Sequence, residues 1–408
     1  MKVLLSAYAC EPGKGSEPGM GWNWAVEIAR LGHEVHILTR INNVAAIERS
    51  LPEVPGLKLY VHGYDLPIWA RFWKKGLRGV QLYYLLWQWG AYRRARVLHK
   101  NLHFDLAHHI TFAVYRYPSL TSRLGIPFIF GPIGGGEYTP PMLLRSAPWR
   151  ARVSEFIRWA ANRIASIDPL VRDTFRRATL ILCKTPETFA AVPIWAREKC
   201  IYIQDVATNS NLLAESPSVG SETARFLFAG NLLHMKGIHL ILRALKIVRS
   251  EIPDATLTIV GDGRDRIWLQ NLARQLGVDE AVEWRGQLPR QEVIGLYASY
   301  TAFVFPSLHD SGGTVVMEAL SQGLPVVCLD LAGPGAILPE DCGIKIPAHC
   351  RSEEQVAASL AGAMKKLACD SVLRRDLAEN ALAAARRQTW EAIVSHAYDE
   401  VQKTLAVR

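Results

Sequence analysis

The first forty residues alternate between a strand pattern and a helix pattern. A short apolar run at Lys2–Tyr8 is followed by a glycine-rich stretch at Glu11–Gly21, a helix-like segment at Trp22–Leu31 and a second apolar run at Glu34–Thr39. This order predicts a strand, a loop, a helix and a strand, which together form a βαβ unit. Repeated units of this kind are typical of a parallel sheet covered by helices.

The alternation occurs in two series, on either side of a stretch rich in Ser, Glu, Pro and Gly at Asn211–Thr223 that we interpret as a linker. Further strands of the first series are predicted at Leu57–Val61, Leu106–Ile110, Pro127–Phe130, Leu180–Cys183 and Cys200–Ile203. The second series predicts strands at Arg225–Ala229, Thr256–Val260, Val282–Arg285, Thr301–Pro306 and Leu324–Asp330. Its helices are expected at Ile238–Arg249, Asp265–Leu276, Gln291–Ala298 and Thr314–Ser321, with Ala- and Leu-rich helices after Ser352.

These two series predict an α/β fold of two doubly wound, Rossmann-like domains. The length of 408 residues agrees, since it exceeds what one ordinary core accommodates. Ligands of such sheets bind beyond the carboxyl ends of the strands, so the cleft between the domains is the expected site.

Composition narrows the class of protein. With 49% apolar and 21% charged residues, the chain has a globular composition. No run of eighteen apolar residues predicts a transmembrane helix, and the apolar start is too short, with too little leading charge, for a signal peptide. The seven cysteines are scattered singly, without a Cys-x-x-Cys pair, which favours a reducing cytoplasm.

The net charge of +9 is concentrated in one segment, Leu66–Phe104, which contains no acidic residue. Its basic residues are Arg71, Lys74, Lys75, Arg78, Arg93, Arg94, Arg96 and Lys100. Its large aromatic residues are Trp69, Phe72, Trp73, Tyr83, Tyr84, Trp87, Trp89 and Tyr92. Basic residues around an aromatic helix are typical of a membrane-surface segment. The alternative is a helix packed on its own domain with a solvated basic face. No nucleic-acid motif accompanies the charge.

The stretch His309–Leu320, HDSGGTVVMEAL, is the strongest functional signal. Asp310 precedes a glycine pair, and Glu318 lies within an otherwise apolar helix, where a carboxylate needs a partner. The free N–H groups of a helix that begins at Gly312 and Gly313 can hold an anion. A phosphate there, with hydroxyls on Glu318, would describe a nucleotide sugar. Alternatively, an internal arginine satisfies Glu318 and the glycines serve only the turn.

Two further glycine-rich stretches follow the first strand of each series. Gly13–Trp22 could approach a bound group closely, but it lacks the G-x-G-x-x-G dinucleotide pattern, and it could equally be a surface loop. In Gly230–Gly237, GNLLHMKG, Lys236 stands at a helix start, where the dipole disfavours a cation. A bound nucleoside diphosphate would resolve this conflict; a solvated lysine is the alternative. No Walker loop is present.

The end of the strand Leu106–Ile110 carries His108 and His109, which could bind substrate or could be satisfied core histidines. The run Gly131–Glu137, GPIGGGE, adds accessible backbone after the next strand. We find no Asp-x-Asp pair and no His/Cys cluster at ligand spacing, so no catalytic metal is predicted.

Together these motifs resemble the retaining family-4 glycosyltransferases of GT-B architecture. The resemblance covers nearly the whole chain, through the first glycine-rich stretch, GNLLHMKG, VGDG at Val260–Gly263 and the D-x7-E pattern of Asp310 and Glu318. It implies two Rossmann-like domains facing a central cleft. The domains would be residues 1–210, with the last helix at about 386–408 packing back on them, and residues 211–385.

The resemblance also implies roles for individual residues. Glu318 would hold the ribose hydroxyls, Asp310 would lie against the donor sugar, and Lys236 would contact the phosphates. Other donor-binding positions would be Gly19, Gly21, Gly230, Asn231, Gly261, Gly312, Gly313, Thr314 and Val315. His108 or His109 would be catalytic, and the acceptor side would include Glu17, Gly134 and Gly135.

Three positions depart from the family pattern. Asp310 replaces the usual Glu, Gly312 replaces a Phe, and Asn231 replaces an Arg that binds phosphate. These changes affect the identity of the donor more than the reaction class.

The resulting prediction is a retaining hexosyltransferase without a cofactor, which uses a nucleoside-diphosphate sugar as co-substrate. Its acceptor would be a lipid-linked or surface-polysaccharide intermediate, and the enzyme would be cytoplasmic, at the inner face of the membrane. The alternatives are a nucleotide-sugar epimerase of the same fold and a non-catalytic scaffold subunit of a polysaccharide-synthesis complex.

Overall fold

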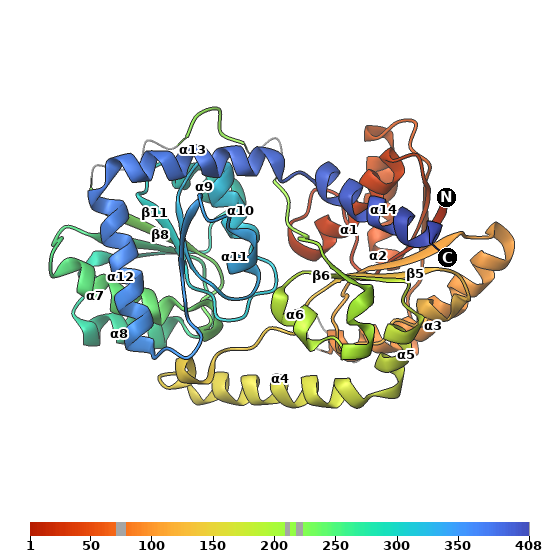
Figure 1. Cartoon of the computed structure of the whole chain (residues 1–408), viewed down its shortest axis with the longest axis horizontal. Coiled ribbons are helices and arrows are strands. Elements are labelled where there is room, and N and C mark those ends of the chain that lie inside the picture. The colour runs from red at the N-terminus through yellow and green to blue at the C-terminus, as the bar shows by residue number, and fades with distance from the viewer. Residues whose placement is uncertain (71–78, 209–212, 218–222, 408) are drawn as a thin grey trace. The chain divides into compact units, whose positions relative to one another are not determined.

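The structure is a computed structural model, and it describes residues 1–70, 79–208, 213–217 and 223–407 (Figure 1). The chain forms two compact units, which we describe separately. Unit 1 comprises Met1–Gly136, Ala160–Asp205 and Trp390–Arg408, and unit 2 comprises Glu137–Trp159 and Val206–Thr389. The segment Glu137–Trp159 was expected in the first domain but packs with the second. Most of the predicted linker lies outside the described residues.

Within the described residues, unit 1 contains a seven-stranded parallel sheet in the order β3-β2-β1-β4-β5-β6-β7. Its strands are β1 (Lys2–Ala7), β2 (Glu34–Thr39), β3 (Leu59–Gly63), β4 (Leu106–Thr111), β5 (Phe128–Ile133), β6 (Leu180–Cys183) and β7 (Cys200–Tyr202). Its helices are α1 (Ser16–Arg30), α2 (Ile41–Ser50), α3 (Val80–Leu102), α5 (Pro169–Arg177), α6 (Pro186–Ala191) and α14 (Trp390–Ala406). The helix α4 (Trp149–Ile167) begins in unit 2 and ends in unit 1.

The described part of unit 2 contains a six-stranded parallel sheet in the order β10-β9-β8-β11-β12-β13. Its strands are β8 (Arg225–Ala229), β9 (Thr256–Val260), β10 (Val282–Gly286), β11 (Ala302–Phe305), β12 (Val326–Leu329) and β13 (Gly343–Ile346). Its helices are α7 (Ile238–Arg249), α8 (Arg266–Leu276), α9 (Arg290–Tyr297), α10 (Thr314–Ser321), α11 (Ala332–Ile337), α12 (Glu353–Cys369) and α13 (Ser371–Arg387). The group α7, α8 and α12 and the group α9, α10 and α11 lie on either side of the sheet in Figure 1.

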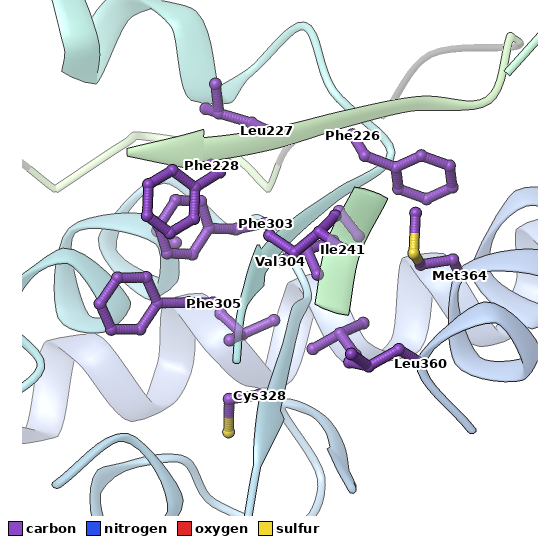
Figure 2. Packing of buried hydrophobic residues seen from close by; sticks show 14 of the residues in the cluster. Phe226, Leu227, Phe228, Ile241, Phe303, Val304, Phe305, Cys328, Leu360 and Met364 are labelled. Atoms are coloured by element: carbon purple, nitrogen blue, oxygen red, sulfur yellow. The ribbon is translucent and has the colours of Figure 1, made fainter. Parts of the chain in front are cut away.

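The core of unit 2 is dominated by phenylalanines of its two central strands. The ring of Phe305 on β11 stacks against Phe228 of β8 at 5.7 Å and against Phe303 at 5.8 Å between centroids (Figure 2). Leu360 and Met364 of α12 belong to the same cluster. This packing holds the carboxyl ends of β8 and β11 together, and the candidate site lies at those ends.

Both sheets have a topological switch point, where the connections leave in opposite directions. It lies between β1 and β4 in unit 1 and between β8 and β11 in unit 2. Loops after the two strands at a switch point diverge and leave room for a ligand at the carboxyl edge. The predicted α/β class with two doubly wound, Rossmann-like domains is therefore confirmed.

Most element boundaries agree with the sequence prediction, with two differences that matter for the site. The helix α1 begins at Ser16, before Pro18, and not at Trp22 as predicted. Proline is tolerated in a first helical turn because its missing N–H is not needed there. The strand β13 was not predicted, since Gly343–Ile346 contains only two apolar side chains besides its glycine and lysine.

The basic, aromatic segment Leu66–Phe104 has both buried and exposed aromatic and apolar side chains. Tyr83, Tyr84 and Trp87 of α3 are fully buried and surround Tyr8, so packing within the domain accounts for these three aromatic residues. Leu82, Leu86 and Trp89 of the same helix are exposed. Arg71, Phe72, Trp73, Lys74, Lys75 and Arg78 lie outside the described residues. Membrane contact of this segment stays a prediction. In the described parts of the chain, every helix is too short or too polar to cross a bilayer.

Candidate functional site

The switch point of unit 2 brings together Lys236 and Asp310. Lys236 ends a 3-10 turn in the loop after β8, and Asp310 lies in the loop after β11. The ammonium of Lys236 donates a hydrogen bond to Oδ2 of Asp310 and lies 5.3 Å from the centre of the Phe305 ring. Both side chains are largely buried, at 15% and 23% exposed. Lys236, the predicted phosphate ligand, and Asp310, the residue predicted to lie against the sugar, thus form one ion pair.

The backbone next to Lys236 is fixed by a glycine. Gly237 has a φ of 73°, and a Cβ at this position would collide with the carbonyl oxygen of Pro306. The turn that carries Lys236 therefore packs directly on the loop that carries Asp310.

Replacing Gly237 with alanine should destabilise the protein by about 2–4 kcal/mol, because it adds left-handed strain and a steric clash. Gly277 is a matched control, since its φ is 70° and a Cβ there would meet nothing within 4 Å. The Gly277→Ala variant should lose only about 1–2 kcal/mol, from strain alone. Urea unfolding measures both losses. Equal losses would show that the close packing of the Lys236 turn is not as described.

The start of α10 lies beside this ion pair. Gly313 is the N-cap residue, with a φ of 116° and no side-chain capping hydrogen bond. The first amides of a helix have no partner within it, so Thr314 and Val315 present donors at the positive end of the helix dipole. Asp310 is held nearby, because its Oδ1 accepts a hydrogen bond from the amide of Gly312 at 3.3 Å. This arrangement suits a phosphate.

Glu318 lies one turn further along α10, about 6 Å from Thr314 along the helix axis. Its side chain is 12% exposed, and its Oε1 accepts a hydrogen bond from Nε of Arg290 at 2.7 Å. Burial raises the pKa of Glu318, and the Arg290 guanidinium opposes this shift. Glu318 therefore has an arginine partner, as the alternative interpretation of the sequence expected. The partner differs from that expectation in one respect, because Arg290 is half-exposed and not internal. A ligand approaching from solvent could displace it.

Arg290 was missed by the sequence analysis, although a signal for it existed. It is the first residue of α9, and the dipole disfavours a cation at a helix start. The same argument had singled out Lys236. Arg290 is thus a second basic residue of unit 2 that pairs with a carboxylate of the candidate site.

The predicted donor-binding glycines after β8 and β9 also have a structural role. The amide of Gly230 donates to the carbonyl of Val260 at 2.9 Å, and a Cβ on Gly261 would collide with the carbonyl oxygen of Gly230. Close packing of the two loops therefore requires Gly261. Asn231 is exposed and next to this contact.

In unit 1, Glu17 in the first turn of α1 connects this helix to the loop after β4 and to Lys184. Its Oε2 accepts a hydrogen bond from the amide of Phe112 at 2.9 Å, and its Oε1 lies 3.7 Å from Nζ of Lys184. Lys184 follows β6 directly and forms a buried ion pair with Asp205 at 2.5 Å. Burial raises the pKa of Asp205, and Lys184 opposes the shift. Lys184 and Asp205 were missed, although a lysine at the carboxyl end of a buried strand could have been noticed.

The glycines predicted to approach a ligand in unit 1 pack against their own chain. Gly19 and Gly21 lie inside α1, where a Cβ would collide with the carbonyl oxygens of Lys14 and Ala9. The amide and carbonyl of Gly134 pair with the backbone after β4, and the carbonyl of Gly135 accepts from side chains of unit 1. Their placement in a ligand-binding loop was wrong for Gly19 and Gly21. Ligand contact at all four positions stays a prediction.

His108 and His109 are both buried and hydrogen-bonded. His108 contacts Gly131 O at 2.7 Å through Nε2 and Tyr398 Oη at 3.2 Å through Nδ1. His109 contacts Tyr84 Oη at 2.8 Å through Nε2 and Ser119 Oγ at 2.6 Å through Nδ1. Both histidines are thus core residues with hydrogen-bond partners, as the alternative interpretation expected. A catalytic role for either stays a prediction.

Both histidines should remain neutral well below neutral pH. Burial lowers the pKa of His108 to about 4 and that of His109 to about 3. Because the unfolded imidazole titrates near 6.5, its proton uptake stabilises only the unfolded chain as the pH falls. Each histidine should therefore reduce the free energy of unfolding by about 2 kcal/mol between pH 7 and pH 5. Histidine NMR titration checks this directly. Midpoints near 6.5 for both imidazoles would contradict it.

Comparison with known proteins identifies the part of the chain that contains the unit 2 site. Residues 213–383 match the profile of the family described as glycosyl transferases group 1. The match is confined to this segment, which is similar to that family. The matched residues include Lys236, Arg290, Asp310 and Glu318, so the paired residues of the candidate site all lie within the match.

Two relatives match over part of their length. One is the D-inositol 3-phosphate glycosyltransferase of Corynebacterium aurimucosum, 31% identical over 172 residues, which are 40% of this chain and 39% of that protein. The other is the glycogen synthase of Mycobacterium tuberculosis, 33% identical over 176 residues, which are 43% of this chain and 39% of that protein. The match thus spans about two fifths of these relatives.

Solved structures resemble the chain over its whole length. Sucrose-phosphate synthase from Thermosynechococcus elongatus has a TM-score of 0.66 at 16% identity, with 100% of both chains covered. The Anabaena protein Alr3699/HepE, solved in complex with UDP and glucose, has a TM-score of 0.62 at 18% identity, covering 100% of this chain and 99% of that one. These likenesses confirm the predicted GT-B fold.

Among the described residues, no group of three His, Cys, Asp or Glu side chains is arranged to hold a metal ion.

Proposed function

We propose that the chain is a retaining hexosyltransferase, which moves a hexose from a nucleoside-diphosphate sugar to an acceptor hydroxyl. The observation that carries this proposal is the convergence of Lys236, Asp310 and the uncapped start of α10 at the unit 2 switch point. A cation, free amides and a carboxylate there match a diphosphate bound to a sugar. The group 1 family match of the same segment supports the reaction class.

The diphosphate would replace Asp310 as the partner of Lys236. In the structure this ammonium forms an ion pair with a carboxylate. A bound diphosphate brings more negative charge and can accept from Lys236 and from the amides of Thr314 and Val315 together. Asp310 would then be released toward the sugar, where its carboxylate could accept a hydrogen bond from a hydroxyl.

Glu318 would bind the ribose through the same kind of exchange. Its carboxylate can accept hydrogen bonds from both ribose hydroxyls once the half-exposed Arg290 moves away. Arg290 would remain available for the phosphates, which would compensate for Asn231 at the position where the family has an arginine.

In the transfer step, the bond between the anomeric carbon and the β-phosphate oxygen breaks, and its electron pair stays on that oxygen. Lys236 and the α10 amides would lie at this developing charge, and their stabilisation of it would lower the barrier. The acceptor oxygen forms the new bond on the same face of the sugar, and its proton passes to the departing phosphate oxygen. The configuration is thereby retained. We propose a lipid-linked or surface-polysaccharide intermediate as the acceptor.

A thermal-shift screen against UDP-, GDP- and ADP-sugars tests donor binding. A ligand that binds only the folded state adds RT ln(1 + [L]/Kd), about 2.7 kcal/mol at a hundredfold excess over Kd. We expect one nucleotide class to raise the melting temperature of the protein. No stabilisation by any of these donors at millimolar concentration would contradict the proposal.

Product analysis then separates transfer from its alternatives. With the donor found in the screen, a transferase should release nucleoside diphosphate in proportion to glycosylated acceptor. An epimerase of the same fold would form a new nucleotide sugar without an acceptor. A scaffold subunit would show neither reaction, even with the donor bound.

A further inference from the structure

The helix α4 exposes its apolar side. Seven large side chains on it are between 46% and 72% exposed: Trp149, Val153, Phe156, Ile157, Trp159, Ile164 and Ile167. Most follow each other at spacings of three, four or seven residues, which places them in one stripe along the helix. The stripe runs the whole length of α4, the yellow helix of Figure 1. Scattered exposed apolar residues are ordinary, but a continuous stripe marks an interaction surface.

The opposite side of α4 is the one that packs on the protein. It contains small or polar residues, among them the buried Ala151 and Ala165. In unit 2, Glu155 lies 3.3 Å from the buried His309. In unit 1, the side-chain amide of Asn162 donates to Gly135 O at 3.2 Å. A surface helix of a soluble domain normally buries its apolar side, so the polarity of α4 is inverted.

The charges beside the stripe have one sign. Arg150, Arg152 and Arg163 are exposed on α4. The helix contains a single acidic residue, Glu155, which lies on the packed side. The exposed part of α4 is therefore apolar and cationic. Such a surface fits a partner that offers hydrocarbon and negative charge together.

We propose that α4 binds the surface of an anionic lipid bilayer, with its apolar stripe in the acyl boundary and its arginines among the headgroups. A helix of 19 residues is about 28 Å long and would lie in the plane of the membrane. The aromatic residues Trp149 and Phe156 suit the interfacial region. A second copy of the chain fits less well, because a two-fold pairing of α4 would bring arginines near arginines.

The inference does not rest on the proposed reaction, because vesicle binding is measured without donor or acceptor. The experiment is flotation of the full chain with vesicles of phosphatidylcholine alone or of phosphatidylcholine mixed with phosphatidylglycerol. We expect binding to the anionic vesicles only, weakening as salt increases. Absence of binding to anionic vesicles at low salt would overturn the proposal.

Variants locate the binding to α4. Phe156→Ser with Ile164→Ser should lower the partition coefficient on anionic vesicles by about tenfold or more, since two apolar anchors are lost. Ile267→Ser is the matched control, because Ile267 is 73% exposed on α8, outside the stripe. It should bind as the wild type does. Equal binding by the double variant and the control would place the membrane contact elsewhere, for example on α3, and would overturn the proposal.

A second pair of variants keeps the test independent of apolar substitutions. Arg150→Glu with Arg163→Glu changes exposed charges only and should remove the preference for anionic vesicles. An unchanged preference would contradict the proposal. Light scattering after size-exclusion chromatography measures the oligomeric state and thereby tests whether a second copy of the chain covers the stripe instead. A wild-type dimer that dissociates in the Phe156→Ser, Ile164→Ser variant, without vesicle binding, would assign the stripe to a second copy of the chain instead.

Discussion

Replacing Lys236 with alanine is expected to lower turnover of the nucleotide-sugar donor by about 100- to 1,000-fold. That range is typical of removing one preorganised group that stabilises the charge of a transition state. Lys236 is the ammonium that the structure places beside the uncapped start of α10, where the leaving diphosphate would lie. Initial rates of nucleoside diphosphate release at saturating donor measure the effect.

Lys246→Ala is the control for this substitution. Lys246 lies on the neighbouring helix α7 and is exposed, so its removal should leave turnover unchanged. Lys236→Arg keeps the charge and should retain part of the rate, although the geometry of a guanidinium differs. If Lys236→Ala folds normally and turns over at the wild-type rate, this lysine is only an internal partner of Asp310 and the proposed phosphate site is wrong.

Replacing Glu318 with alanine is expected to weaken donor binding by about 10- to 150-fold, because hydrogen bonds from two ribose hydroxyls to a carboxylate are lost. Stability should change by less than about 1 kcal/mol, since the partner Arg290 is half-exposed and such pairs contribute little. Calorimetric titration with the donor measures the affinity, and urea unfolding measures the stability.

Arg290→Ala decides between the two interpretations of Glu318. If Glu318 binds ribose, this variant should leave donor affinity less affected than Glu318→Ala does. If Glu318 only pairs with Arg290, the two variants should change affinity equally, or neither should change it. Glu280→Ala is the control for the loss of a carboxylate, since Glu280 is an exposed residue of unit 2. It should bind donor normally.

The fold was predictable because its signals are local. The strands β6, β8 and β9 and the helices α7 and α10 have the predicted boundaries, since each combines a clear apolar period with a turn residue at its end. The start of α1 was missed because glycine and proline have low helix propensity, which the tight packing of Gly19 and Gly21 outweighs.

The exposed side of α4 could not be predicted, for a different reason. Its apolar stripe would normally indicate the buried side of a helix, and nothing in the sequence shows that small residues such as Ala151 and Ala165 face the protein instead. Which side of an amphipathic helix is covered depends on residues far away in sequence. The structure alone supplied that information.

The residues of the candidate site were proposed from the sequence one by one, but their pairings could not be predicted. Lys236, Asp310 and Glu318 were each identified, yet the Lys236–Asp310 ion pair depends on how the loops after β8 and β11 meet. The partner of Glu318 could not be chosen from the sequence, because many arginines were available. His108 and His109 could be located at the end of β4, whereas their full burial depends on Tyr84, Ser119 and Tyr398 from other elements.

A crystal structure of the chain with a bound nucleoside diphosphate is the most direct test of the central claim. We expect diphosphate oxygens within hydrogen-bonding distance of Lys236 Nζ and of the amides of Thr314 and Val315. The ribose hydroxyls should lie on the Glu318 carboxylate, with Arg290 displaced from it. A nucleotide bound elsewhere, with the Lys236–Asp310 and Arg290–Glu318 pairs both intact, would contradict the account.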